Sequence, residues 1–195
     1  SKIENLNNKI SYINTIDKIK LEILNQKKNL FTNDFSLISK LDAILICVPT
    51  PLSKNRDPDL SFITNTINYI LPFLKAGQII ALESTTYPGT TEEVIIPAIK
   101  NIDFRPGENF FIIYSPERED PGNTKYSTKT IPKICGGYSK NCLEIGKILY
   151  EQVVDKVIPV SSLKTAELTK LLENVYRSVN IGLVNELKKV ADKMD

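Results

Sequence analysis

The most regular hydrophobic pattern in the chain lies between Ser161 and Asp195. This stretch contains no proline and a single glycine, Gly182. Its apolar residues return at steps of three and four, the period of an amphipathic helix: Leu168, Leu171, Leu172, Val175, Val179, Leu183, Val184, Leu187 and Val190. Ser161 or Ser162 supplies the hydroxyl group of an N-cap, so the pattern predicts one long helix.

A line of polar side chains runs beside this apolar stripe. Lys170, Asn174 and Arg177 have the spacing i, i+4, i+7, which stacks side chains along one face of a helix. A cation, an amide and a guanidinium on one line would suit an anionic ligand that carries hydroxyl groups. By spacing alone, a solvated helix face explains these residues better, so the rest of the chain has to decide.

Short apolar runs alternate with helical patterns through the middle of the chain. The runs predict strands at 42–48, 78–83, 110–114, 133–135 and 153–160, and the helical patterns predict helices at 59–74, 90–99 and 139–151. Near-continuous apolar strands that alternate with helices are typical of a parallel, doubly wound sheet, so the predicted fold class is α/β. The first 40 residues are more polar and predict helices near 2–9 and 16–26 and a short strand at 30–32.

Polar turns follow three of the predicted strands, and they read VPTP, ESTTYPGT and YSPERED. Ligands of open α/β sheets bind outside the carboxyl ends of the strands. Each of these turns alone is most often only a loop. Gathered on one rim of the sheet, they predict a ligand-binding cleft.

Composition narrows the classes of function. The chain is 42% hydrophobic and 25% charged with a formal net charge of +2, so it lacks the basic footprint of a nucleic-acid-binding protein. It has no histidine, and its three cysteines, Cys47, Cys135 and Cys142, form no metal-binding pattern. No apolar run reaches the length of a membrane span, and no signal peptide is recognisable. We therefore expect no metal, no nucleic-acid or membrane partner, and a cytoplasmic location.

Four segments together resemble the nucleotide-sugar 6-dehydrogenases, and they occur in that family's order. They are CVPTP at 47–51, ESTTYPGTTEE at 83–93, SPEREDPGN at 115–123 and AELTKLLENVYRSVNIGLVNEL at 166–187. VPTP alone is a weak signal, whereas the four at these separations are a strong one. The SPER turn, with Arg118 after its glutamate, resembles the turn of the branch that oxidises UDP-N-acetylhexosamines.

The resemblance implies a reaction and a cofactor. The family oxidises the C6 alcohol of a nucleotide sugar to the carboxylate in two steps, each with one NAD, through a cysteine thioester. The expected substrate is UDP-N-acetylglucosamine, then UDP-N-acetylmannosamine, as a precursor of surface polysaccharide. UDP-glucose and GDP-mannose 6-dehydrogenases remain alternatives, as does a non-catalytic module that binds a UDP-sugar or assembles through the long helix.

The resemblance also implies roles for individual residues. Glu117 would handle the attacking water, and Lys170 and Asn174 would stabilise negative charge on the C6 oxygen. The residues that would contact NAD are Pro49, Thr50, Ser84 and Thr85, and those that would contact the substrate are Arg118, Glu119, Lys170, Asn174 and Arg177. For Glu117, the alternative is an ordinary surface carboxylate in a turn.

Two motifs of that family are not found in this sequence. There is no G-x-G-x-x-G turn to cradle a pyrophosphate, and no cysteine stands in a Gly-Gly-His-Cys context. We expect an internal piece of a longer enzyme, inactive alone, in which the sheet lacks its first βαβ unit. In this interpretation 1–160 is a partial NAD-binding domain and 161–195 is the first part of a central helix that forms a homodimer. The strand at 42–48 would then have an exposed edge. Either residues 1–40 would be the least well packed part, or another chain would complete the sheet.

Overall fold

The structure is a computed structural model, and it describes residues 1–12, 16, 18–26, 29–100, 103–118 and 127–194. The chain divides into two compact units, Ser1–Leu37 and Ile38–Asp195. The first unit carries two helices, α1 (Lys2–Asn7) and α2 (Lys18–Gln26). The second unit carries the sheet and the long helix predicted from the sequence.

The first unit is loosely packed, as predicted for this end of the chain. Its helix α1 begins with a capping box between Ser1 and Glu4. Leu21 is the single buried side chain among the described residues of the first 40. The predicted helices are present, whereas the predicted strand at 30–32 is wrong. These residues form no ladder with any strand that the structure describes, and an unpaired extended segment is not a strand.

The second unit is organised around five short strands that lie in the order β1-β2-β3-β4-β5. They are β1 (Ala43–Ile46), β2 (Ile79–Leu82), β3 (Phe111–Tyr114), β4 (Lys133–Gly137) and β5 (Val157–Pro159). Within the described residues, β1 pairs with β2 alone and forms one edge of the sheet. The exposed edge predicted for the strand at 42–48 is thereby confirmed.

The sheet is not parallel throughout, which corrects the sequence-based expectation. The β1–β2, β2–β3 and β4–β5 pairs are parallel, but β3 and β4 are antiparallel, with Ile113 opposite Gly137. A parallel neighbour needs a crossover connection, usually a helix, whereas an antiparallel neighbour does not. The sequence between β3 and β4 contains the SPEREDPGN turn rather than a helical pattern, which fits the antiparallel return.

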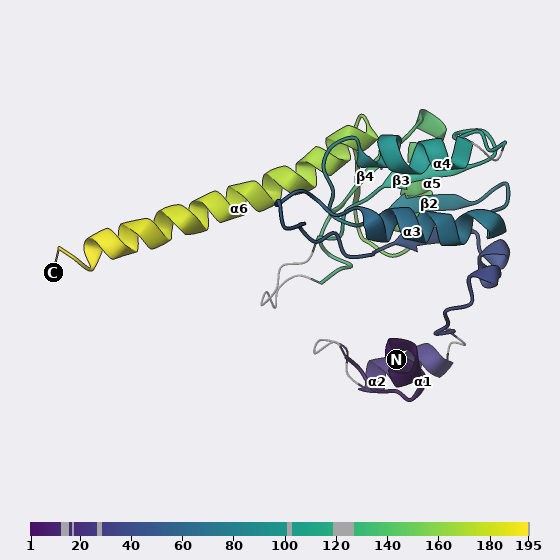
Figure 1. The fold of residues 1–195 in the computed structure, drawn as a ribbon, viewed down its shortest axis with the longest axis horizontal. Helices are drawn as coiled ribbons and strands as arrows, with labels where there is room; N and C mark the ends of the chain where they lie inside the picture. Colours follow the sequence, from purple (N-terminus) through teal and green to yellow (C-terminus); the bar gives the residue numbers. More distant parts are fainter. Residues whose placement is uncertain (13–15, 17, 27–28, 101–102, 119–126, 195) are drawn as a thin grey trace. The chain divides into compact units, whose positions relative to one another are not determined.

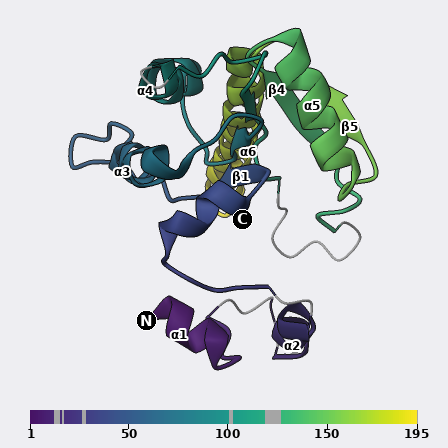
Figure 2. The ribbon, with the colours of Figure 1, turned by 90° about the vertical axis from the view of Figure 1, so that its right-hand side faces the viewer.

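Helices cover both faces of this sheet, so the layers of a doubly wound α/β fold are present (Figure 2). One face carries α3, η2, the π-helical turn η3 and α4; the other carries α5. Their bounds are α3 (Ser61–Ile70), η2 (Leu71–Phe73), η3 (Thr91–Ile95), α4 (Ile96–Lys100) and α5 (Lys140–Glu151), and the 3-10 helix η1 (Phe35–Lys40) precedes β1. Successive strand residues point to opposite faces, so Ile80 and Ile112 join one core cluster while Ala81 and Ile113 join the other.

The long helix α6 (Leu163–Ala191) is packed only at its beginning. Ser162 caps it by accepting a hydrogen bond from the Thr165 backbone N–H at 3.1 Å. A β-carbon at Gly136 would lie 2.6 Å from the Ser162 carbonyl oxygen, so glycine at this position lets the helix approach β4. Beyond the first turns the apolar stripe is exposed, and Figure 1 shows α6 running out past the sheet. No helix in the described ranges is both long and apolar enough to cross a bilayer.

Candidate functional site

The three polar turns predicted to share a rim do lie together. Strands β1, β2 and β3 are parallel, so their carboxyl ends meet at one edge of the sheet. The Thr50 hydroxyl donates to the Thr85 carbonyl at 2.6 Å, and the Ser84 hydroxyl donates to the Val48 carbonyl at 2.7 Å. From β3, the Tyr114 hydroxyl donates to the Ser84 carbonyl at 3.1 Å. These bonds join the strand ends directly.

The four residues predicted to contact the cofactor all belong to these joined turns. Pro49 and Thr85 are exposed, Thr50 is half-buried and Ser84 is buried. The hydroxyl protons of Thr50 and Ser84 are donated to carbonyl groups of the chain itself. The structure therefore brings the four residues together, and their contact with a cofactor stays a prediction.

Helix α6 reaches the same rim through Lys170. The Lys170 ammonium donates to the backbone carbonyl of Glu117 at 2.8 Å, which places the two residues on the same side of the molecule. Partial burial lowers the pKa of Lys170, and the positive charges of Arg177 and Arg118 act in the same direction. The bond is made to the Glu117 backbone rather than to its carboxylate, so the carboxylate keeps its own partner.

Arg118 links the turn after β3 to the long helix. Its guanidinium donates to the Pro132 carbonyl at 3.0 Å and lies 2.5 Å from the Glu173 carboxylate on α6. Of the two other predicted substrate contacts on α6, Asn174 is half-buried and Arg177 is exposed. Neither side chain has a hydrogen-bond partner within the described ranges. Glu119, also predicted to contact the substrate, lies outside the described residues.

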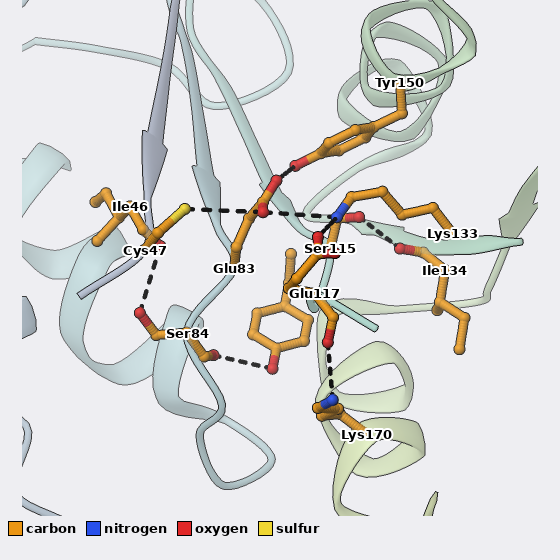
Figure 3. Close-up of polar contacts among 11 residues, drawn as sticks. Ile46, Cys47, Glu83, Ser84, Ser115, Glu117, Lys133, Ile134, Tyr150 and Lys170 are labelled. Atoms are coloured by element: carbon orange, nitrogen blue, oxygen red, sulfur yellow. Dashed lines mark hydrogen bonds and ion pairs between the residues drawn. The ribbon is translucent and has the colours of Figure 1, made fainter. Parts of the chain in front are cut away.

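Five side chains form a connected group that we call the Lys133 cluster: Lys133, Glu83, Glu117, Tyr150 and Cys47 (Figure 3). The Lys133 ammonium is 3.1 Å from Glu117 Oε2 and 3.5 Å from Glu83 Oε2. The side chains of Lys133 and Glu83 are each 8% exposed, whereas that of Glu117 is 45% exposed. The cluster therefore places a buried cation between a buried and a half-exposed carboxylate.

Tyr150 completes the buried part of this cluster from α5. Its hydroxyl donates to Glu83 Oε1 at 2.6 Å, and its ring centroid lies 4.8 Å from the Lys133 ammonium. Burial raises the pKa of Tyr150, and the negative charge of Glu83 raises it further. The phenol therefore stays protonated and remains a donor to Glu83.

Sequence reasoning missed Lys133, Glu83 and Tyr150 as members of a site. Glu83 was part of a recognised motif but had no role assigned to it. Lys133 opens β4, and only the antiparallel direction of that strand brings it to this rim. The available signal in the sequence was a lysine at the start of an apolar strand. Without the direction of that strand, the lysine could not be placed at this edge of the sheet.

Glu167 was missed as well, although it is fully buried in α6. Its carboxylate accepts hydrogen bonds from the backbone N–H groups of Gly89 and Thr91 and from the Thr91 hydroxyl. It thereby fixes the start of α6 to the turn after β2. Its position four residues after Leu163, on the face that packs on the sheet, was the sequence signal that this carboxylate is buried.

The structure buries two of the three cysteines and leaves the third exposed. Cys135 and Cys142 are buried, and burial raises the pKa of Cys135 to about 12. The Cys47 residue is exposed, but its thiol donates to Glu83 Oε2 at 3.8 Å. Partial burial of the thiol, and then the Glu83 charge, raise the pKa of Cys47 from 9.0 to about 11.

The raised pKa predicts slow alkylation of Cys47. A shift of this size leaves about a hundredfold less thiolate at about pH 8 than an ordinary cysteine has, and the thiolate is the reactive form. Iodoacetamide labelling followed by peptide mass spectrometry should reach half its maximal rate near pH 11. Glu83→Gln should move this midpoint down, because it removes the neighbouring negative charge. A midpoint near pH 9.0 in the unchanged protein would contradict the prediction.

Comparison with known proteins agrees with the motifs. Residues 1–154 match the UDP-glucose/GDP-mannose dehydrogenase family, NAD binding domain, and residues 164–195 match the central domain of that family. A relative from Staphylococcus aureus, protein CapL, is 36% identical over all of this chain and 46% of its own length. The UDP-N-acetyl-D-glucosamine 6-dehydrogenase of Pseudomonas aeruginosa is 35% identical over 84% of this chain and 39% of its own length.

A solved structure is similar throughout the chain. The native structure of the UDP-N-acetyl-mannosamine dehydrogenase Cap5O from Staphylococcus aureus superposes with a TM-score of 0.84 and 35% identity. The match covers 99% of this chain and 47% of that one, so the chain spans about half the length of the relatives it matches. The family match covers more than half of the 195 residues. This chain therefore belongs to the UDP-glucose/GDP-mannose dehydrogenase family, and it carries sequence of both the NAD-binding and the central domain.

Proposed function

We propose that the protein containing this chain oxidises the C6 alcohol of a UDP-N-acetylhexosamine to the carboxylate, with two molecules of NAD as acceptors. The contact between Lys170 and Glu117 carries this proposal, because it unites two residues that the motifs assign to one reaction centre. The UDP-N-acetyl-D-glucosamine 6-dehydrogenase among its relatives supports the choice of an N-acetylated sugar.

One buried polar atom at the joined strand ends supports the binding of a cofactor there. The Thr86 hydroxyl oxygen is buried and has no hydrogen-bond partner in the described part of the chain, so a bound group would satisfy it. Pro49 and Thr85 are exposed at the joined strand ends beside it. We assign NAD binding at this rim to Pro49, Thr50, Ser84 and Thr85. NAD, when bound, accepts the hydride that leaves C6.

On α6, Lys170 and Asn174 act on the alcohol itself. As the C6 hydroxyl loses its proton, negative charge develops on the oxygen, and a fixed ammonium and amide stabilise it. Both side chains stand on one helix face one turn apart, so the helix sets their separation before the substrate arrives. We assign contacts with the nucleotide sugar to Arg118, Glu119 and Arg177.

Glu117 acts in the hydrolytic step. The acid forms when water adds to a thioester carbonyl: the new C–O bond forms, the C–S bond breaks, and the sulfur leaves with the electron pair. Glu117 accepts the proton of that water. We assign the thiol to none of the three cysteines of this chain: Cys135 and Cys142 are buried, and the raised pKa of Cys47 disfavours its thiolate. The sum is one alcohol, two NAD⁺ and one water giving one carboxylic acid, two NADH and two protons.

The proposal extends to the assembly and location of the protein. The exposed apolar stripe of α6 supports a homodimer that covers it with a second copy of the helix. In this proposal, residues 1–160 form a partial NAD-binding domain and residues 161–195 form the start of a central helix. Three free thiols support a reducing, cytoplasmic location.

The test is NADH formation by the intact protein with a panel of nucleotide sugars. We expect two NADH per sugar consumed, and at least about tenfold higher kcat/KM for a UDP-N-acetylhexosamine than for UDP-glucose or GDP-mannose. Reactions without NAD serve as the control for contaminating activity. A preference for UDP-glucose or GDP-mannose would favour those family members instead. Binding of a UDP-sugar by calorimetry without any NADH would favour a non-catalytic module.

A further inference from the structure

Lys133 reaches Glu117 because of the direction of β4. The antiparallel register sets Tyr114 opposite Gly136, and carrying it three residues beyond Tyr114 brings Lys133 opposite Glu117. The Ser115 hydroxyl donates to the Ile134 carbonyl at 2.7 Å and keeps the two chains together on this path. The pairing of β3 with β4 therefore fixes the backbone from which the Lys133 ammonium reaches Glu117.

The ammonium is also fixed from its other sides by buried groups. A buried cation needs a charged or hydrogen-bonded partner, and Glu83 supplies one. The two oxygens of Glu83 also accept from Tyr150 and Cys47, so this carboxylate cannot rotate without losing bonds. The Tyr150 ring borders the ammonium at 4.8 Å. Lys133 thus has a defined place that does not depend on Glu117.

Glu117, in contrast, has few restraints of its own. Its side chain is nearly half exposed, and Lys133 contacts one of its two carboxylate oxygens, Oε2. On the main-chain side, the Lys170 ammonium holds its carbonyl group. Lys133 therefore selects one direction for a glutamate that would otherwise sample several rotamers in solvent. Figure 3 shows Glu117 between these two lysines.

We propose that Lys133 is a positioning residue for the hydrolytic step, one that holds the Glu117 carboxylate in the direction from which it takes the proton of water. This inference rests on the proposed function, in which Glu117 performs that proton transfer. Glu83 and Tyr150 act one step further back, because they hold the ammonium. A misplaced base loses rate even when substrate binding is unchanged, since the transfer depends on geometry.

The competing interpretation is that Lys133 only cross-links β2, β4 and α5. The two interpretations differ in what Lys133→Met does. A cross-link would lower stability and every step of the reaction alike. A positioning residue would slow hydrolysis selectively, and its effect would depend on the presence of the Glu117 carboxylate.

The experiment uses the intact protein with NAD and the best nucleotide sugar of the panel. The variants are Lys133→Met, Lys133→Arg, Glu117→Gln and the double variant Lys133→Met/Glu117→Gln. Lys147→Met is the matched control, because it removes an α5 lysine that pairs with Glu144 away from the Lys133 cluster. The readouts are the rapid phase of NADH formation, steady-state kcat and KM, the melting temperature, and the intact protein mass after rapid quenching.

Lys133→Met should lower kcat about tenfold with KM within about twofold, because a hydrogen bond to a charged group is lost. The rapid NADH phase should persist, and a covalent sugar adduct should accumulate in the mass spectrum. Lys133→Arg should recover most of the turnover. In the Glu117→Gln background, Lys133→Met should lower kcat by less than about twofold, since the carboxylate that Lys133 positions is gone.

An equal loss from Lys133→Met in both backgrounds would overturn the inference. So would a rapid phase that slows in proportion to kcat. A Glu117→Gln variant with unchanged turnover would remove the proposed role of Glu117 and this inference with it, and absence of NADH with every sugar would remove the proposed function. If Lys133→Met does not fold, Tyr150→Phe takes its place. It removes the bond to Glu83 and should lower kcat about threefold, and a full additive effect with Glu117→Gln would overturn the inference.

Discussion

Lys170→Ala is expected to lower the kcat of the intact protein by about 10²–10³-fold, the usual loss when one donor to a developing oxyanion is removed. The dissociation constant for NAD should stay within about twofold of its original value. The reason is that the Lys170 ammonium lies at the Glu117 backbone, where the proposed function puts the reacting alcohol, and not at the joined turns of Thr50 and Thr85. Stopped-flow NADH formation and fluorescence titration of NAD measure the two quantities.

The control for Lys170→Ala is Lys164→Ala on the same helix. Lys164 pairs with Glu92 at 3.0 Å and its side chain is 56% exposed, so its removal should leave kcat unchanged. Equal losses of turnover and NAD affinity in Lys170→Ala would assign this lysine to folding instead. The pH profile adds a further check: burial lowers the pKa of Lys170, so the activity that needs its charge should fall as pH rises through a value below the ordinary 10.5.

Glu167→Ala is expected to destabilise the protein by about 3–5 kcal/mol, because it removes a buried charged acceptor and leaves its donors unsatisfied. Those donors are the Gly89 and Thr91 backbone N–H groups and the Thr91 hydroxyl, all held by this one carboxylate. A left-handed Gly89, with φ at 110°, shapes the turn so that its N–H can face α6. Urea unfolding of the intact protein should show the loss as a lower midpoint.

Glu186→Ala is the matched control for Glu167→Ala. Glu186 is on the same helix but is exposed and pairs with Lys189 at 2.7 Å, so its loss should cost less than about 0.5 kcal/mol. Glu167→Gln should fall between the two, since an amide offers one acceptor and places a donor against the other N–H. If Glu167→Ala and Glu186→Ala unfold at the same urea concentration, the anchoring role of Glu167 is wrong.

The elements that could be predicted are those whose type follows from the spacing of apolar residues alone. The apolar run at 78–83 could only be a buried strand, and the three- and four-residue steps after Ser162 could only be a helix. The meeting of Lys170 with the SPER turn was expected from the family resemblance, whereas the parallel strands explained only why the three polar turns share a rim. The pairing of β3 with β4 was not predictable in the same way, because an apolar strand has the same pattern in either direction.

The missed site residues have one physical cause in common. Lys133, Glu83 and Glu167 are buried charges, and their environments depend on partners far away in the chain. Periodicity identifies which side of an element is apolar, but it does not identify the distant groups that form ion pairs or hydrogen bonds with a charged side chain there. Lys133 needed the direction of β4, and Glu167 needed the position of the turn at Gly89.

The anchoring of α6 at its first turns has a mechanical consequence. A helix from Leu163 to Ala191 is about 43 Å long, of which about 36 Å lies beyond Glu167, so a tilt of about 5° about the Glu167 anchor would swing the far end by about 3 Å. Lys170 is less than one turn from that pivot and would move by less than about 1 Å under the same tilt. Because displacement grows with distance from the pivot, the far end of the helix can shift while the Lys170 ammonium keeps its place beside the turn after β3.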